Sequence, residues 1–176
     1  MHKKLLAWYQ SFVGSKTPTS QMIRSAKSAD LPSVKHLADR HKRELGFVLN
    51  PALRDAIQEE RVIIAVHQGQ QLAGFLHFRH RRDRVTKIYQ ICVEGCYRRQ
   101  GYGKAMISEL ARRALSAGQT SIVLACPEDL LANKFYEAYG FIHSGLVPGR
   151  VRSLVQWSLK IGRASTVVAS EAERCH

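Results

Sequence analysis

The sequence is poor in acidic residues, in paired cysteines and in long apolar runs. Its 14 Asp and Glu residues stand against 27 Lys and Arg residues, so the formal net charge of the 176 residues is +13. No apolar stretch reaches the roughly 18 residues that a membrane-spanning helix needs. Cys92, Cys96, Cys126 and Cys175 form no C-x-x-C pair, so neither a metal site nor a disulfide framework is indicated. We expect free thiols and a cytoplasmic location.

The excess of positive charge favours anionic partners. Nucleic acid, an acidic membrane surface and a phosphate-rich small molecule all fit that preference. The length suits one domain, and 45% apolar with 23% charged residues argues against wholesale disorder. The sequence therefore predicts one globular, basic domain.

Three segments differ in pattern along the chain. Residues 1–19 combine a basic start with a short apolar run that Gln10 and Ser11 interrupt, which is typical of an amphipathic helix and linker rather than a signal peptide. Its apolar stripe is expected to pack on the domain in preference to a membrane. Residues 20–161 carry regular hydrophobic periods and form the expected domain. Residues 162–176 lack periodicity and are expected to be a flexible tail.

Hydrophobic periodicity within the domain predicts strands alternating with helices. The expected strands are 21–26, 62–66, 72–78, 85–93, 122–126, 141–146 and 154–159. The expected helices are 31–45, 50–60, 102–117 and 130–139, and the basic run 79–84 is expected to be a loop. This order predicts an α+β, or mixed α/β, domain built around one sheet.

The loop between the fourth strand and the third helix carries the clearest chemical signal. It contains the pattern R-x-x-G-x-G across Arg98, Gly101 and Gly103. Backbone amides at a helix start attract anions, and glycines let that backbone approach phosphate oxygens. A Walker loop would need Ser or Thr at Ala105, and a dinucleotide fingerprint would need Gly at Met106. The loop therefore predicts a phosphate site of another kind.

A second motif lies one strand later, where a helix ends at a glycine and an apolar strand follows. With this motif, the sequence resembles the GNAT superfamily of N-acetyltransferases across roughly residues 21–161. The resemblance implies about seven mostly antiparallel strands, splayed between the fourth and fifth and flanked by about four helices. It rests on Ile91-Cys92-Val93, on Arg98 to Lys104, on Phe135-Tyr136 and on Gly140-Phe141.

The resemblance implies acetyl-CoA as acyl donor and no metal. The loop would hold the CoA pyrophosphate through its amides, with arginine and lysine adding charge. The preceding strand would pair with the pantetheine arm, and the second motif would lie along the thioester. The residues so implied in cofactor binding are Ile91, Cys92, Val93, Arg98, Arg99, Gln100, Gly101, Tyr102, Gly103, Lys104, Asn133 and Tyr136.

Acetyl transfer to an amine needs an acid for the leaving thiolate and a neutral amine. Tyr136 is similar in position to the tyrosine proposed to protonate the thiolate in this family, and a phenol can do so. Several members carry a glutamate base where this chain has Lys87, and an ammonium group accepts no proton. Tyr89, His77 and Glu94 are the candidate bases, beside a water relay or an amine that arrives neutral.

Four residues bear further on these assignments: Tyr89, Asp129, Cys92 and Cys96. Strand alternation places Tyr89 on the face of Ile91. Asp129 stands where many relatives carry asparagine, so one cofactor contact is in question. Cys92 and Cys96 have no activating group nearby in the sequence, which favours structural thiols over a covalent acetyl-enzyme.

The function predicted from these features is that of an acyltransferase, which transfers acetyl from acetyl-CoA to a primary amine by direct attack. One alternative is acetylation of an RNA-borne amine such as aminoacyl-tRNA, because the charge is so positive. Another is a non-catalytic module that binds CoA, nucleic acid or a membrane. The basic clusters at 40–43, 79–87 and 150–152 suggest an acidic acceptor, and the sequence leaves the acceptor and a homodimer open.

Overall fold

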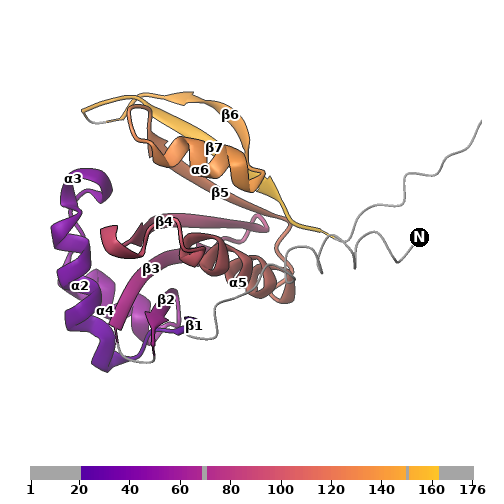
Figure 1. Cartoon of the computed structure of the whole chain (residues 1–176). Coiled ribbons are helices and arrows are strands. Elements are labelled where there is room, and N and C mark those ends of the chain that lie inside the picture. The colour runs from indigo at the N-terminus through magenta and orange to yellow at the C-terminus, as the bar shows by residue number, and fades with distance from the viewer. Residues whose placement is uncertain (1–20, 69–70, 150, 163–176) are drawn as a thin grey trace, which may run out of the picture.

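The computed structural model describes residues 21–68, 71–149 and 151–162, so the expectations for the amino-terminal helix, the carboxyl-terminal tail and Arg150 lie outside the described residues. These residues form a seven-stranded sheet in the order β1-β2-β3-β4-β5-β7-β6 (Figure 1). The strands are β1 (Gln21–Ser25), β2 (Val62–His67), β3 (Gln71–His80), β4 (Val85–Val93), β5 (Ser121–Pro127), β6 (Ile142–Val147) and β7 (Leu154–Lys160). Neighbours are antiparallel except β4 and β5, which confirms the predicted fold class.

The helices cover the two faces of this sheet. They are α2 (Leu31–Arg40), α3 (Lys42–Leu45), α4 (Asn50–Gln58), α5 (Tyr102–Ser116) and α6 (Ala132–Tyr139), with short 3-10 turns at Ser28–Asp30 and Gly95–Tyr97. In the described ranges, no helix is long and apolar enough to cross a bilayer.

Successive residues of the central strands feed two separate cores, because side chains alternate between sheet faces. Ile63 of β2 packs in the core beneath α5 and α6, whereas Ile64 packs in the core beneath α2 and α4. From the helices, Leu110 of α5 packs in the first of these cores and Val34 of α2 in the second, and both side chains are fully buried. Figure 1 shows α5 across one face of β2–β4, with α2 and α4 beyond the other.

The predicted helix over 31–45 is wrong in one respect, since it breaks at His41. This residue has φ −104° and ψ 20°, and α3 starts after it. The apolar period continues to Leu45, but at the break the His41 ring lies 3.7 Å from a carboxylate oxygen of Glu44 and 3.8 Å from one of Glu94. The break turns α3 toward β4.

The expected loop over 79–84 is shorter than predicted. Arg79 and His80 belong to β3 and pair with Lys87 and Thr86 of β4, because their charged or polar side chains reach the surface while their backbones complete the ladder. Helix α6 likewise begins at Ala132 rather than at residue 130.

The parallel pair β4–β5 is short and then opens. Among the described residues, these strands pair only over Val85–Lys87 and Ser121–Val123. Beyond that point β5 pairs with β7 on its other side, from Leu124 opposite Trp157 to Pro127 opposite Leu154. The distal half of β4 remains paired with β3. The predicted splay between the fourth and fifth strands is thus confirmed.

Candidate functional site

A cavity of about 580 Å³ lies between the splayed ends of β4 and β5. Its walls come from four places: the two strands, α3, the start of α6 with Tyr136, and the β6–β7 turn. The lining residues are Arg43, Glu44, Leu45, Gly46, Ile88, Tyr89, Gln90, Ile91, Leu124, Ala125, Cys126, Pro127, Leu130, Ala132, Tyr136, Gly149, Val151, Arg152 and Leu154. A pocket with apolar walls and a few polar groups is the usual form of a small-molecule site.

Tyr136 lies at the wall of this cavity with its ring in the core. It is 5% exposed, and its ring centroid is 5.8 Å from that of Phe141 and 6.3 Å from that of Trp157. Burial raises the pKa of its hydroxyl well above the ordinary value, and the nearby thiols of Cys126 and Cys92 add to the effect. The phenol therefore stays protonated at neutral pH and can act as a proton donor.

Asn133 fastens the turn that precedes Tyr136. Its side-chain Nδ2 lies 2.8 Å from the carbonyl oxygen of Pro127 and 3.0 Å from that of Leu130, and its Oδ1 accepts from Trp157 Nε1 at 2.8 Å. The amide is thus engaged within the protein. Its predicted contact with the thioester stays a prediction, while these bonds give it a positioning role for α6.

The loop that the sequence predicts to bind phosphate ends at the amino end of α5. Gly101 is the N-cap residue with φ +88°, a left-handed conformation that favours glycine. Gly101 has no side chain to cap the first amides of α5, so no capping side chain offsets the positive end of the helix dipole. A Cβ on Gly103 would lie 3.2 Å from the Phe135 ring. The absence of a side chain at Gly103 lets α6 approach α5, and the two sequence motifs meet here.

The side chains of this loop point in several directions. Arg98 donates from Nε to the Val93 carbonyl at 3.2 Å and lies 3.4 Å from a Glu44 oxygen, so its guanidinium faces the end of β4 and α3. Gln100 donates to the Cys96 carbonyl at 2.9 Å. Tyr102 is 1% exposed, so its side chain belongs to the core and only its backbone can meet a ligand.

A bulge in β4 changes the predicted placement of Tyr89. Gln90 pairs with His77 and Ile88 with Phe78, which leaves Tyr89 as the extra residue. Its ring lies 5.2 Å from that of His77, whereas Ile91 packs against the core under α5. The expectation that Tyr89 shares the face of Ile91 is therefore wrong, although Tyr89 does line the cavity.

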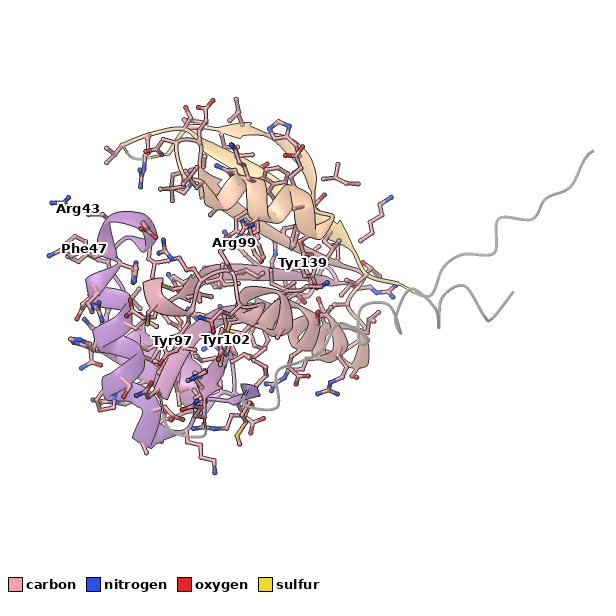
Figure 2. All side chains as sticks on the ribbon, in the orientation of Figure 1. Arg43, Phe47, Tyr97, Arg99, Tyr102 and Tyr139 are labelled. Carbon is pink, nitrogen blue, oxygen red and sulfur yellow. The ribbon has the colours of Figure 1, made fainter. Side chains whose placement is uncertain are left out.

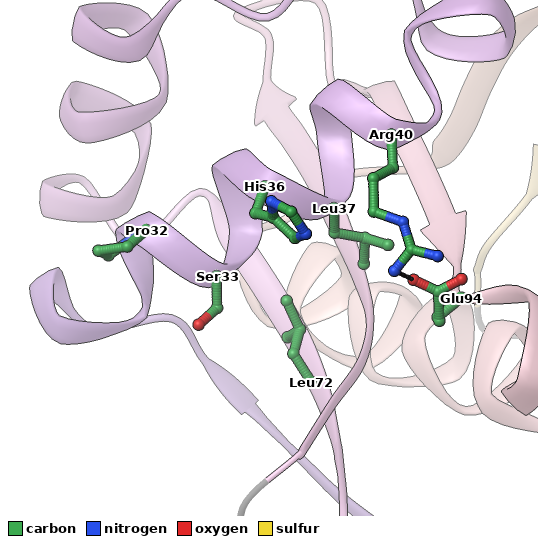
Figure 3. A pocket seen from close by; sticks show the side chains of 7 residues that line it. All are labelled: Pro32, Ser33, His36, Leu37, Arg40, Leu72 and Glu94. Atoms are coloured by element: carbon green, nitrogen blue, oxygen red, sulfur yellow. Dashed lines mark ion pairs between the residues drawn. The ribbon is translucent and has the colours of Figure 1, made fainter.

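The other two predicted bases lie outside the residues that line the cavity. His77 Nδ1 lies 2.8 Å from Gln90 Oε1, and burial lowers the pKa of its ring. Glu94 pairs with Arg40 at 2.8 Å and lines a separate groove of about 370 Å³ beside α2 (Figure 3). Its bond from the Gly95 amide, together with Arg40, lowers its pKa, which makes it a weaker base.

Glu44 is a candidate that the sequence did not reveal. Among the described residues that line the cavity, it is the only one with a carboxylate. It lies on α3, far upstream of both motifs, and no local pattern marks it. The break at His41 is what brings α3 over the cavity.

Arg152 joins the two sides of the cavity mouth. It binds Asp129 at 2.7 Å and donates to the Arg43 carbonyl at 2.8 Å, so it connects the β6–β7 turn with both α3 and the turn after β5. Figure 2 shows Arg43 and Phe47 at the outer end of this rim. Arg152 belongs to the basic cluster that suggested an acidic acceptor, and Asp129, questioned as a cofactor contact, is its partner.

The buried cysteines are protonated thiols. Burial raises the pKa of Cys92 to about 12 and that of Cys126 to about 11. A thiol of such high pKa holds almost no thiolate at neutral pH. Their burial fits the structural role that the sequence suggested.

Comparisons with known proteins bear on the family and the fold. A sequence model of the acetyltransferase (GNAT) family matches residues 26–141. N-acetylaspartate synthetase from Xenopus tropicalis is 29% identical over 99 residues, which are 53% of this chain and 36% of that protein, so the chain spans about a third of its length.

Many solved structures share the fold, and two of them serve as examples. Ard1 from Thermoplasma volcanium superposes with a TM-score of 0.74 at 19% identity, covering 82% of this chain and 100% of that one. N-acetylglutamate synthase from Neisseria gonorrhoeae, solved with coenzyme A and N-acetyl-glutamate, has a TM-score of 0.71 at 17% identity, covering 81% of this chain and 35% of that one.

Proposed function

The chain belongs to the acetyltransferase (GNAT) family, and from this premise we propose that it transfers the acetyl group of acetyl-CoA to a primary amine by direct attack. One observation carries the proposal. The contact of Gly103 with Phe135 joins the amino end of α5, an anion site, to the helix that brings Tyr136 to the cavity wall. The predicted phosphate site is thereby packed against the helix that carries the buried proton donor.

The residues present fit CoA. The edge of β4 that faces β5 has no strand partner over Ile91, Cys92 and Val93 in the described part of the chain, and an extended, amide-containing arm can add to such an edge. The helix start at Gly101 follows directly and suits the pyrophosphate. Arg99 and Lys104 add charge, whereas Arg98 would have to leave the Val93 carbonyl to do so.

Bound acetyl-CoA would supply the thioester. Tyr136 would donate its proton to the leaving sulfur, and burial favours this transfer because a buried thiolate is also destabilised relative to the thiol. Glu44 would take the proton of the attacking amine, directly or through water, since it is the carboxylate at the cavity. Tyr89 and His77, which contact each other through their rings, form the alternative route for that proton.

The acceptor is proposed to be a primary amine on an acidic molecule. Arg43 and Arg152 line the cavity against one carboxylate, Glu44, and the whole chain carries +13. The relatives named for N-acetylaspartate and N-acetylglutamate synthesis make aspartate and glutamate the first acceptors to try. Acidic peptides and aminoacyl-tRNA complete the set.

Calorimetry with acetyl-CoA tests the cofactor assignment. Gly101→Glu places a carboxylate against the predicted pyrophosphate site and should abolish saturable binding. Gly118→Glu is the matched control, because Gly118 lies at the other end of α5, has φ +72° and also faces open space. No binding by the wild type, or equal binding by both variants, would overturn the assignment.

Thiol release with the acceptor set tests catalysis. Release of free CoA that depends on both the acceptor and Tyr136 supports catalysis by this chain. The mass of the product then identifies the acetylated amine. Binding of acetyl-CoA without release for any acceptor would favour the non-catalytic module instead.

A further inference from the structure

The end of the β2–β3 hairpin lies against the phosphate loop. His67, the last residue of β2, places Nδ1 2.5 Å from the hydroxyl of Tyr102. The same imidazole lies against the ring of Tyr97, with 4.9 Å between centroids. Tyr97 ends the turn before the loop, and Tyr102 is the first residue of α5. One side chain therefore touches both flanks of the loop, whose tyrosines, Tyr97 and Tyr102, lie next to each other in Figure 2.

Further contacts tie these flanks to the hairpin. The Tyr97 hydroxyl donates to Gln71 Oε1, and Gln71 is the residue opposite His67 in the β2–β3 ladder. The rings of Tyr97 and Tyr102 are 5.8 Å apart, nearly perpendicular. The two tyrosines and the two hairpin residues make one cluster, which we call the hairpin brace: His67, Gln71, Tyr97 and Tyr102.

The segment between the two tyrosines has an unfavourable backbone. Arg99 has φ +64° and Gly101 has φ +88°. The left-handed conformation costs a residue with a Cβ free energy, and it persists only where surrounding contacts over-determine it. The hairpin brace supplies such contacts on both sides of the segment.

We propose that His67 is a positioning residue for the phosphate loop, which it holds in the shape that receives the pyrophosphate. This inference rests on the proposed function, since acetyl-CoA is the ligand concerned. His67 does not touch the reacting atoms, because it sits at the far end of the hairpin from the cavity lining. It acts on affinity for the donor and not on the acetyl transfer step.

The matched pair His67→Phe and His80→Phe tests this role. Each histidine is partly buried, places Nδ1 against a hydroxyl and has a ring against an aromatic, since His80 Nδ1 lies 2.8 Å from Thr86 Oγ1 and its ring lies 5.1 Å from that of Phe78. His80, however, is at the closed end of β4. Tyr102→Phe removes the same bond as His67→Phe from the other side with little change of shape.

Two donors separate positioning from a general loss of structure. With acetyl-CoA, His67→Phe and Tyr102→Phe should each raise the dissociation constant about tenfold, the effect of one lost hydrogen bond, at unchanged kcat. With S-acetylpantetheine, which lacks the pyrophosphate, kcat/KM should equal that of the wild type. His80→Phe should leave the dissociation constant unchanged.

The role of His67 would be overturned by equal losses of kcat/KM with acetyl-CoA and with S-acetylpantetheine. An unchanged dissociation constant for acetyl-CoA in Tyr102→Phe would also overturn it. Failure of the wild type to bind acetyl-CoA would instead overturn the proposed function. Calorimetry on the wild type, done first, distinguishes these failures.

Discussion

β4 and β5 are bonded partners at one end and the two walls of a cavity at the other. At the closed end Thr86 is fully buried and bonded to His80, and Ile122 opposite it is fully buried too. At the open end Tyr89 and Leu124 face a cavity. One pair of strands thus provides stability where it is closed and a binding surface where it is open.

Two local features cause the difference. The bulge at Tyr89 bends β4, because an extra residue increases the local twist. On the other side, β5 continues its ladder with β7, which keeps β5 in the sheet without β4. The opening therefore leaves the facing edges of both strands without a strand partner in the described part of the chain, where a ligand can pair with them.

The largest effect is expected at the open end from Tyr136→Phe. Loss of the proton donor should lower kcat about 100- to 10,000-fold, the usual share of acid catalysis, with little change in acetyl-CoA affinity. Tyr139→Phe is the control, because that partly buried hydroxyl on the same helix contacts Ser108 at 3.2 Å and does not line the cavity. Similar losses in both variants would remove the acid role from Tyr136.

The pH profile gives the same group a second test. Because burial raises the pKa of Tyr136, the active protonated form persists beyond the ordinary tyrosine pKa of about 10. Turnover should show no alkaline limb from this residue below that pH. A limb near pH 8 that Tyr136→Phe abolishes would contradict the assignment.

At the closed end the expected loss is one of stability. Ile122→Ala should lower the free energy of unfolding by about 3 kcal/mol, because it empties a fully packed site. Leu124→Ala, two residues on, should cost less, roughly 2 kcal/mol or below, since it only enlarges an existing cavity. Urea unfolding measures both losses. A larger loss of stability in Leu124→Ala than in Ile122→Ala would contradict the claim that the closed end provides stability and the open end a binding surface.

Glu44→Gln is expected to give a smaller effect. It removes the carboxylate from the cavity and should lower kcat about tenfold, less than a full base contribution, because 44% of the Glu44 side chain is exposed and water can take part. Glu94→Gln, in the groove beside α2, should leave kcat near the wild-type value. If only Glu94→Gln slows turnover, the proton leaves by another route.

The smallest effect is expected from the cysteines. Cys92→Ala and Cys126→Ala should each keep kcat within about twofold, since the high pKa of these thiols disfavours an acetyl-enzyme. Mass spectrometry after mixing with acetyl-CoA alone should find no acetylated thiol. An adduct on Cys126, which lines the cavity, would contradict direct attack.

The sequence predicted the strands and the turn before α5 because each depends on a local pattern, whereas the role of Tyr136 comes from the family resemblance and, like the phosphate site, stays a prediction. Apolar runs mark β2 and β5, and glycines at 101, 103 and 140 mark the turns where the chain must bend or approach closely. These signals lie within a few residues of what they determine, so one sequence suffices.

The remaining features depend on residues that are distant in the chain. Nothing near Tyr89 marks it as a bulge, since the extra residue exists only relative to β3. Glu44 reaches the cavity because the helix breaks at His41, and the apolar period runs on through that break. The brace between His67 and Tyr102 likewise joins a hairpin to a helix through tertiary packing alone.

Amide hydrogen exchange along β4, with and without acetyl-CoA, most directly tests the claim that the donor binds at the open end of the β4–β5 pair. The single strand β4 contains both the closed end and the open end. We expect acetyl-CoA to protect amides over Tyr89–Val93 and at the start of α5, and to leave Val85–Lys87 unchanged. Equal protection along the whole strand, or none at the open end while acetyl-CoA binds elsewhere, would contradict the assignment of the donor site to the splayed strands.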